Sequence, residues 1–447
     1  MKAIVCATLM LLAQVSLGQS PETVTIADIY KLDAPSNVIS VVGTVTAVAG
    51  LDFVLADESG SVLVSKDFRP DCRPGDRVKT TLVIRRHPPA SRTVYASRIK
   101  TLRAGMKPIA PHAATIRELK SGSFDFLPVE ICGTVTDVSR DELDPNFIYI
   151  TLESDDAATI LTVHDKTADP GPLNARIDTE VCVTGICIPN RGDYRQNLDR
   201  RVYIDPKTAF HPIDESNNAG SQQYPHRQET TGNVLSDCGH GAFYLRTDSG
   251  ERIKVFLSAG ERSPAVGTTV TVAGFVRKNI FFTSLSNAIV IRTNPATGNT
   301  ETPVRISPRT LLFNPEGKPK LKIEYEGRPI RIRGTVRSVS EPLTEDGRLL
   351  LDSEGLDLSV RLGAFTPPPV GSEVEVSGIC SITSESDGNP YGFVRLTGFT
   401  LLTRGPEDVV ILKNPPWWTP TKMLAVIAAL VLLVVAVLIW NKALRTL

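Results

Sequence analysis

The hydrophobic and polar positions divide this chain into a long central part and two apolar ends. In the central part, short segments such as 41–48 alternate between apolar and polar residues, and no long segment repeats its apolar residues with a helical period. Alternation with a period of two is typical of strands that have one buried face. We therefore predict that the region between the two ends is all-β.

The C-terminal end contains the longest apolar run of the sequence. Met423 to Trp440 includes no charged side chain, and a helix of this length, at about 1.5 Å per residue, covers roughly 27 Å, enough to cross the hydrocarbon core of a membrane. Trp417, Trp418 and Trp440 flank the run, as aromatic residues do at membrane interfaces. We predict a transmembrane helix at 423–440 with these three tryptophans at the interfaces. A buried core helix is the alternative that the uncharged length disfavours.

The N-terminal end has the pattern of a secretory signal. Lys2 is followed by the apolar run 3–15 and then by a small residue at 16 and another at 18. This order is typical of a signal peptide that is cleaved after residue 18. Lys442 and Arg445 in the short tail agree with a cytoplasmic C-terminus. We therefore expect most of the chain to lie outside the cytoplasm.

The central part contains four copies of a repeat of about 90 to 100 residues. Each copy has a glycine within its first alternating strand and a turn rich in Asp, Ser or Gly between its second and third strands. A glycine inside a strand suggests a bend. Five short strands in this order, with a longer link between the third and fourth, resemble an OB-fold barrel. We predict tandem OB-fold-like five-stranded barrels, each holding one of the four glycines in its first strand: Gly43, Gly133, Gly232 and Gly334.

These marks set the predicted domain organisation. Short helices are expected before the first, second and fourth copies, with N-caps at Thr25, Thr115 and Ser307. The third copy has no such helix, and we expect it to deviate most from a regular barrel. The predicted segments are a signal peptide at 1–18, OB-like repeats at 19–111, 112–213, 224–293 and 303–413, linkers at 214–223 and 294–302, a membrane junction at 414–422, the transmembrane helix at 423–440 and a cytoplasmic tail at 441–447.

Charge and motifs exclude several classes of function. The formal net charge is zero and only 6% of the residues are aromatic, so electrostatics gives no support to nucleic-acid binding. The six histidines are scattered, without the spacing of metal ligands. No nucleophile, phosphate-binding or paired-carboxylate motif is present. We predict a protein that is not an enzyme and that has no cofactor, no metal and no catalytic residues.

The seven cysteines show no CxxC pair. Cys187 and Cys380 occupy the same place in their repeats, where a small buried hydrophobic residue is the favoured interpretation. An oxidising compartment permits a disulfide, and Cys132 with Cys182 is the candidate pair.

The second copy has the strongest pattern for binding. Phe147 and Tyr149 share one side of its second strand, opposite Ile148 and Ile150, and its fourth-to-fifth loop is rich in arginine and tyrosine. Such rings and guanidinium groups can stack on a sugar or a base and pair with a carboxylate or a phosphate. An ordinary solvated hairpin is the alternative. The candidate ligand-binding residues are Phe147, Tyr149, Arg191, Tyr194, Arg195, Arg200 and Tyr203.

The membrane junction resembles that of a known class of proteins. The stretch 409–420 ends in Pro-Pro-Trp-Trp-Thr-Pro, directly before the apolar run. Together with the signal peptide and the β-rich repeats, it resembles the extracytoplasmic sensor half of bacterial membrane sensor histidine kinases. The kinase half that follows the helix in that family has no counterpart here, and all six histidines precede the helix. The resemblance implies a single-pass protein of the bacterial inner membrane, with its bulk in the periplasm and a separate histidine kinase as a possible partner.

Three functions remain open on these grounds. The first is a membrane-anchored periplasmic binding or sensory module for a small molecule, a glycan or an envelope protein. The second is a structural or protein-interaction scaffold of the cell envelope. The third is an oligonucleotide-binding protein, which the neutral charge and the extracytoplasmic location disfavour.

Overall fold

A computed structural model describes most of the chain. The described residues are 21–31, 38–87, 91–105, 110–154, 157–191, 197–213, 224–278, 281–295, 301–340, 347–363, 365–385, 395–415 and 420–446. The predicted signal peptide, the linker 214–223, Trp417 and Trp418 lie outside these residues. The chain divides into an N-terminal unit, Met1–His226, and a C-terminal unit, Arg227–Leu447, which we describe separately.

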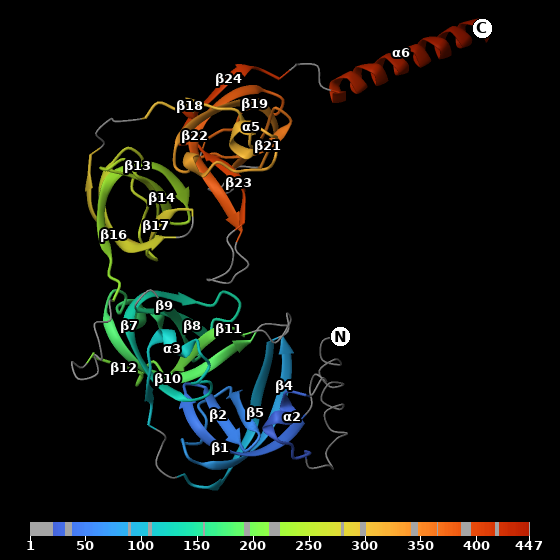
Figure 1. The fold of residues 1–447 in the computed structure, drawn as a ribbon. Helices are drawn as coiled ribbons and strands as arrows, with labels where there is room; N and C mark the ends of the chain where they lie inside the picture. The colour runs from blue at the N-terminus through green and yellow to red at the C-terminus, as the bar shows by residue number, and fades with distance from the viewer. Residues whose placement is uncertain are drawn as a thin grey trace. The chain divides into compact units, whose positions relative to one another are not determined.

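Each unit contains two closed five-stranded barrels, which we number 1 to 4 along the chain (Figure 1). In barrel 1 the spatial order is β1-β2-β3-β5-β4, and β1 pairs with both β2 and β4, which closes the sheet. Barrels 2, 3 and 4 repeat this order and this closure. The predicted all-β fold of tandem OB-like barrels is therefore confirmed.

The strands of the N-terminal unit are β1 (Val38–Ala49), β2 (Asp52–Asp57), β3 (Gly60–Ser65), β4 (Arg77–His87), β5 (Ser91–Arg103), β6 (His112–Ala113), β7 (Pro128–Arg140), β8 (Phe147–Ser154), β9 (Ala157–His164), β10 (Glu180–Arg191), β11 (Asn197–Ile204) and β12 (Phe210–His211). Those of the C-terminal unit are β13 (Gln228–Gly239), β14 (Ala242–Thr247), β15 (Arg252–Leu257), β16 (Thr269–Lys278), β17 (Thr283–Asn294), β18 (Val304–Arg305), β19 (Pro329–Val339), β20 (Arg348–Ser353), β21 (Leu356–Arg361), β22 (Glu373–Glu385), β23 (Arg395–Leu402) and β24 (Val409–Lys413). The helical segments are α2 (Ile26–Ile29), α3 (Ile116–Leu119), α4 (Pro170–Asn174), α5 (Pro308–Leu312), η1 (Ile323–Tyr325), η2 (Pro406–Asp408) and α6 (Pro420–Thr446).

The repeat glycines lie where the first strand of each barrel passes from one neighbouring strand to the other. Gly43 is opposite Val78 of β4, and the other three glycines also face a valine of the fourth strand. A Cβ atom on Gly43 would lie 2.8 Å from the carbonyl oxygen of Ala56 on β2. In the other copies the distance to the matching carbonyl oxygen is 2.6, 2.2 and 2.5 Å. Glycine is therefore required because two backbones approach too closely for a side chain.

Three short helices, α2, α3 and α5, precede barrels 1, 2 and 4, as the sequence predicted. Thr115 forms a complete capping box with Glu118, and the hydroxyl of Thr25 accepts a hydrogen bond from the backbone N–H of Asp28. Ser307 caps α5, with Pro308 in its first turn. The buried faces of the helices join the barrel cores, for example through Ile116. Each helix thus adds apolar residues to a barrel that has its own core.

Barrel 3 closes in the same strand order as barrel 1, while its β13–β14, β15–β17 and β16–β17 ladders contain register shifts. That the third copy deviates most from a regular barrel stays a prediction. No helix precedes β13 among the described residues 224–227. Closure needs the β13–β16 ladder, in which Gly232 faces Val270, and this ladder forms without a helix. The helix contributes to the core of a barrel and does not determine its topology.

The helix α6 follows barrel 4 (Figure 1). Its segment Met423–Lys442 has a mean hydropathy of 3.2, and none of it is buried against the rest of the chain. Among the described residues, α6 is the one helix that is long and apolar enough to cross a membrane. Trp440, at its end, is exposed.

The cysteines follow the sequence predictions. Cys132 of β7 and Cys182 of β10 face each other across the ladder that closes barrel 2, and they form a disulfide. Cys187 and Cys380 are free and buried within the cores of barrels 2 and 4.

Candidate binding face of barrel 2

The outer surface of strands β8, β9 and β11 forms the candidate site, which we call the outer face of barrel 2. Along β8, Ile148 and Ile150 are buried in the core, while Phe147 and Tyr149 are half-buried on the opposite side. The predicted alternation is therefore confirmed. Tyr149 and Tyr203 lie on either side of Thr162 of β9, because both face it in their ladders.

Tyr149 and Arg201, both partly exposed, form the centre of this face. The guanidinium carbon of Arg201 lies 5.2 Å from the centre of the Tyr149 ring, within the range of a cation–π contact. The hydroxyl of Tyr149 donates a hydrogen bond of 2.9 Å to Asp141. Burial and the Asp141 carboxylate raise the pKa of Tyr149 to about 12, so the phenol stays protonated and remains a donor. The pair presents an aromatic ring beside a guanidinium group that carries several N–H donors.

The loop between β7 and β8 borders the pair and is held in shape by its own hydrogen bonds. A carboxylate oxygen of Asp141 accepts from the backbone N–H groups of Leu143 and Asp144, both at 2.8 Å. The guanidinium of Arg140 donates to the carbonyl oxygens of Pro145 and Ala168, both at 2.7 Å. These bonds leave the side chain of Leu143 97% exposed at the tip of the loop. The face is therefore bordered by a preorganised loop that ends in an apolar side chain.

Arg200 does not belong to the exposed face, contrary to its predicted place. Its side chain is only 12% exposed, and it pairs with Asp125 at 3.1 Å and donates to the carbonyl oxygen of Lys120 at 2.8 Å. On β11 the buried residues are Val202 and Ile204, so residue 200 shares their side of the strand and Arg201 takes the outer side. The alternation of the two apolar residues is the sequence signal that identifies Arg201, which the candidate set omitted.

Phe147 and Tyr203 are engaged with neighbouring groups. The Phe147 ring stacks on His164, with ring centres 4.2 Å apart. Nδ1 of His164 lies 2.9 Å from the buried carboxylate of Asp52 in barrel 1. Tyr203 packs on an apolar cluster that barrels 1 and 2 share, Ala47, Ala49, Val54, Ile186 and Ile188. Because of this packing, Tyr203 does not lie on the open surface on which the sequence analysis placed it.

The side chains of the other three candidates, Arg191, Tyr194 and Arg195, are not described by the structure. The backbone of Arg191 ends β10, but its side chain is outside the description, as are Tyr194 and Arg195. A ligand-binding role for the candidate set stays a prediction. Within the described part of the chain, no three His, Cys, Asp or Glu side chains gather as a metal site would require.

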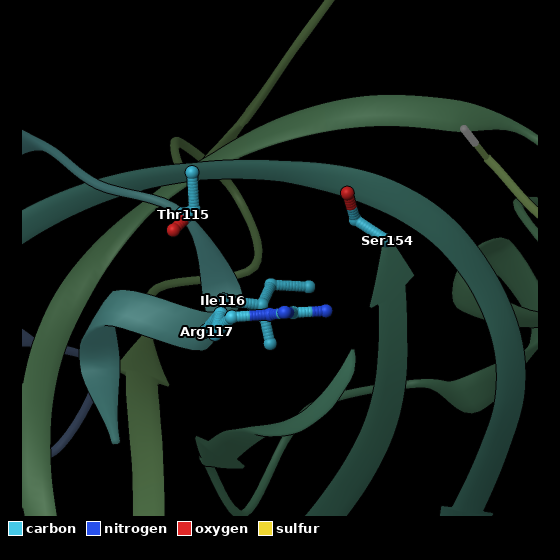
Figure 2. A pocket seen from close by; sticks show the side chains of 4 residues that line it. All are labelled: Thr115, Ile116, Arg117 and Ser154. Atoms are coloured by element: carbon cyan, nitrogen blue, oxygen red, sulfur yellow. The ribbon is translucent and has the colours of Figure 1, made fainter. Parts of the chain in front are cut away.

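A small pocket of about 330 Å³ lies at the other end of β8. Figure 2 shows Thr115, Ile116 and Arg117, at the start of α3, across the pocket from Ser154 at the end of β8. Ser154 is five residues from Tyr149 along the strand, roughly 16 Å at about 3.3 Å per residue. The pocket is thus separate from the outer face, and its place beside the turn of a repeat was not foreseen from the sequence.

Comparisons with known proteins identify no family. No protein-family model matches the chain, and no curated protein matches it. Among solved structures, the chain is similar to a replication protein A heterotrimer bound to ssDNA (11% identity, 59% of this chain, 96% of that chain, TM-score 0.22). It is also similar to the tetrameric p202 HIN2, at 12% identity over 38% of this chain and 95% of that chain, with a TM-score of 0.20. A third similar structure is a multidomain protein with nucleic acid binding domains from Streptococcus pneumoniae TIGR4, at 10% identity over 56% of this chain and 72% of that chain, with a TM-score of 0.12. At TM-scores of 0.22 and below, these likenesses carry no inference about what this chain binds.

Proposed function

We propose that this protein is a membrane-anchored binding module, in which the outer face of barrel 2 holds a ligand against Tyr149 and Arg201. The observation that carries the proposal is the guanidinium of Arg201 at 5.2 Å from the Tyr149 ring, beside an ordered loop. OB-type barrels bind through the second and third strands and the adjoining loops. Tyr149 lies on the second strand of barrel 2, and Arg201 lies on the fifth strand, which pairs with the third. The ring and the guanidinium can act together on a ligand that has both a flat face and a negative charge.

The location proposed for the module is the extracytoplasmic side of a bacterial inner membrane. The apolar helix α6 supports an anchor, and the Cys132–Cys182 disulfide supports an oxidising compartment such as the periplasm. The role proposed is sensory, with a separate histidine kinase as the partner. That last step rests only on the resemblance of the Pro-Pro-Trp-Trp-Thr-Pro junction to sensor kinases.

The ligand class proposed is an acidic glycan of the envelope or a small molecule with a sugar ring and a carboxylate. A sugar ring can stack on Tyr149, while Arg201 can pair with the carboxylate in two parallel hydrogen bonds. A long polyanion such as an oligonucleotide requires many cationic contacts along its backbone, and the formal net charge of this chain is zero. The oligonucleotide is therefore the third choice.

A thermal-shift panel on the full-length protein in detergent tests the proposal. The probes are an acidic oligosaccharide, its neutral counterpart and a short single-stranded oligonucleotide. A ligand at 100 times its Kd adds about 2.7 kcal/mol of stability, which raises Tm by roughly 5–10 °C for a unit of this size at about 2–4 °C per kcal/mol. We expect this rise with the acidic oligosaccharide alone.

Two variants show whether a rise comes from the proposed site. Arg201→Gln should abolish it, because the guanidinium that pairs with the ligand is lost. Arg277→Gln is the matched control, since Arg277 also lies over a ring, that of Phe275 at 5.7 Å in barrel 3. A rise that survives Arg201→Gln, or no rise with any probe, would contradict the proposal.

A second function, an envelope scaffold, is favoured by one observation. Tyr203 and the His164–Asp52 contact use part of the outer face to join barrels 1 and 2. If the face serves packing alone, none of the probes raises Tm, and Tyr149→Ala lowers the Tm of the free protein.

A further inference from the structure

The outer surface of barrel 4 carries a cluster of cations close to the membrane helix. Strands β18, β19, β22 and β24 lie side by side in that order. The intervening residues Ile330, Ile332, Val374 and Val376 are buried in the core, so the residues between them face outward. We call the outward cations the basic face of barrel 4: Arg305, Arg331, Arg333 and Lys413.

These cations outnumber the carboxylates beneath them. Arg305 and Arg331 both lie 3.6 Å from Glu375, while Arg333 and Lys413 both pair with Glu373. Four cations against two carboxylates leave two net positive charges. Lys413 and Arg333 hold the pKa of Glu373 below its usual value, so this carboxylate stays ionised and the count holds at neutral pH.

The cations also extend further into solvent than their partners. Arg305 is 65% and Lys413 is 72% exposed, whereas Glu375 and Glu373 are 21% and 26% exposed. Each carboxylate contacts two cations, and Nε of Arg331 also donates to the hydroxyl of Ser377. Arg305 and Lys413 extend furthest into solvent and therefore offer N–H donors to a further anion.

An exposed apolar side chain continues the same surface on β24. Val410 is 51% exposed, whereas Ile411 is opposite the buried Val374 and takes the other side of the strand. Val410 faces Glu375 in the ladder, so it adjoins the basic face directly. A surface that combines cations with apolar side chains is typical of proteins that lie against a membrane interface.

The chain length after β24 limits how far this surface can be from the membrane. Pro420, the first residue of α6, comes seven positions after Lys413. At no more than about 3.6 Å per residue they span at most roughly 25 Å. If α6 crosses a bilayer, β24 is therefore held within reach of the headgroups.

We propose that the basic face of barrel 4 docks on anionic phospholipid headgroups of the membrane that anchors α6, with Val410 at the lipid interface. The inference rests on the proposed membrane anchor. Anionic headgroups match the two net positive charges, and polybasic surfaces beside a membrane helix bind such lipids. A second copy of the chain fits less well, because two basic faces would repel each other.

Fluorescence of the full chain in lipid nanodiscs tests this inference. Val410→Cys is labelled with an environment-sensitive fluorophore, and discs of phosphatidylcholine are compared with discs that also contain phosphatidylglycerol. The unaltered chain, taken through the same labelling, gives the background of the native cysteines. We expect a blue shift at position 410 only in the anionic discs. Ile291→Cys is the matched control, because Ile291 of barrel 3 is 49% exposed, and no shift is expected there.

A charge variant separates lipid binding from other causes. Arg305→Gln with Lys413→Gln removes the two net charges and leaves Arg331 paired with Glu375 and Arg333 paired with Glu373. This variant should lose the blue shift while keeping its Tm. A shift that is the same in neutral discs, or one that requires two copies per disc, would overturn the inference. Failure of the membrane anchor itself would appear separately, as a chain that does not elute with the discs.

Discussion

At the scale of single residues, the glycine of each first strand is the best-determined feature of the chain. A Cβ atom at position 334 would lie 2.5 Å from the carbonyl oxygen of Asp352 and 2.7 Å from Cγ of Leu351. Two contacts this short force the strands apart, and overpacking of this kind costs about 1–3 kcal/mol.

Gly334→Ala should therefore lower the stability of the C-terminal unit by that amount, measured as a lower urea midpoint. Gly363→Ala is the control in the same barrel, because its Cβ would meet only the Phe365 ring at 3.6 Å. Equal effects of the two variants would show that the close approach of the strands is not what requires glycine.

His226 gives a prediction about pH. Its Nδ1 lies 3.0 Å from Asp178 and its Nε2 lies 2.9 Å from Glu180. Ionised carboxylates only accept hydrogen bonds, so the ring must carry both protons to satisfy both contacts. The hydrogen bond to Glu180, followed by that to Asp178, raises the pKa of His226.

A raised pKa in the folded state fixes the sign of the pH effect. The stability that His226 contributes is fully present below the unfolded pKa of about 6.5, and it is lost as the pH rises through the folded value. An NMR titration of the ring should give an apparent pKa above that of an unfolded histidine. In His226→Gln, the free energy of unfolding should no longer fall as the pH rises through the folded pKa of His226. A ring that titrates at or below the unfolded value would contradict the contacts.

The sequence predicted the site residues correctly where the alternation of the strand was clear. It failed where contacts with another barrel determine whether a side chain is exposed. The alternation along β8 placed Phe147 and Tyr149 correctly. Along β11, Val202 and Ile204 are buried, so the period of the strand places Arg201 and not Arg200 on the outer side. Tyr203 could not be assigned from the sequence, because its burial depends on contact with barrel 1, which lies more than a hundred residues earlier in the chain.

At the scale of elements, the disulfide joins the two strands that close barrel 2. Cys132 and Cys182 are 50 residues apart in the sequence and directly opposite in the β7–β10 ladder. Linking residues this far apart reduces the entropy of the unfolded chain by an amount worth about 4 kcal/mol, and measured values are typically about 2–4 kcal/mol.

Replacing both cysteines with serine should therefore cost roughly that much, measured by urea unfolding. Cys238→Ser is the control, because Cys238 is free and partly buried. If the double variant unfolds at the same urea concentration as the unaltered chain, the disulfide does not stabilise barrel 2.

Strand order was predictable at this scale because the repeat marks recur in all four copies. The short strands β6, β12, β18 and β24, which extend the sheets of barrels 2 and 4, were not predicted. Two-residue strands such as β6 carry no period that a sequence pattern can show.

At the scale of the whole molecule, the apolar helix α6 leads to a prediction about topology. If α6 spans the membrane with the barrels outside, protease added to spheroplasts should degrade the barrels and leave a small fragment that contains 423–447. Protease added to inverted vesicles is the control and should leave the barrels intact. Protection of the barrels in spheroplasts would place them in the cytoplasm and contradict the proposed location.

Binding at the outer face of barrel 2 is the central claim, and a calorimetric titration of full-length Tyr149→Ala with the acidic oligosaccharide tests it most directly. Loss of a stacking ring should weaken binding by about 1–3 kcal/mol, while the free protein keeps nearly the same Tm because the ring is only half-buried. Tyr30→Ala is the matched control, a partly exposed tyrosine of barrel 1 whose hydroxyl donates to the carbonyl oxygen of Ser61. It should leave binding unchanged. Unchanged affinity in Tyr149→Ala together with a lower Tm would show that the ring serves packing and would contradict the account.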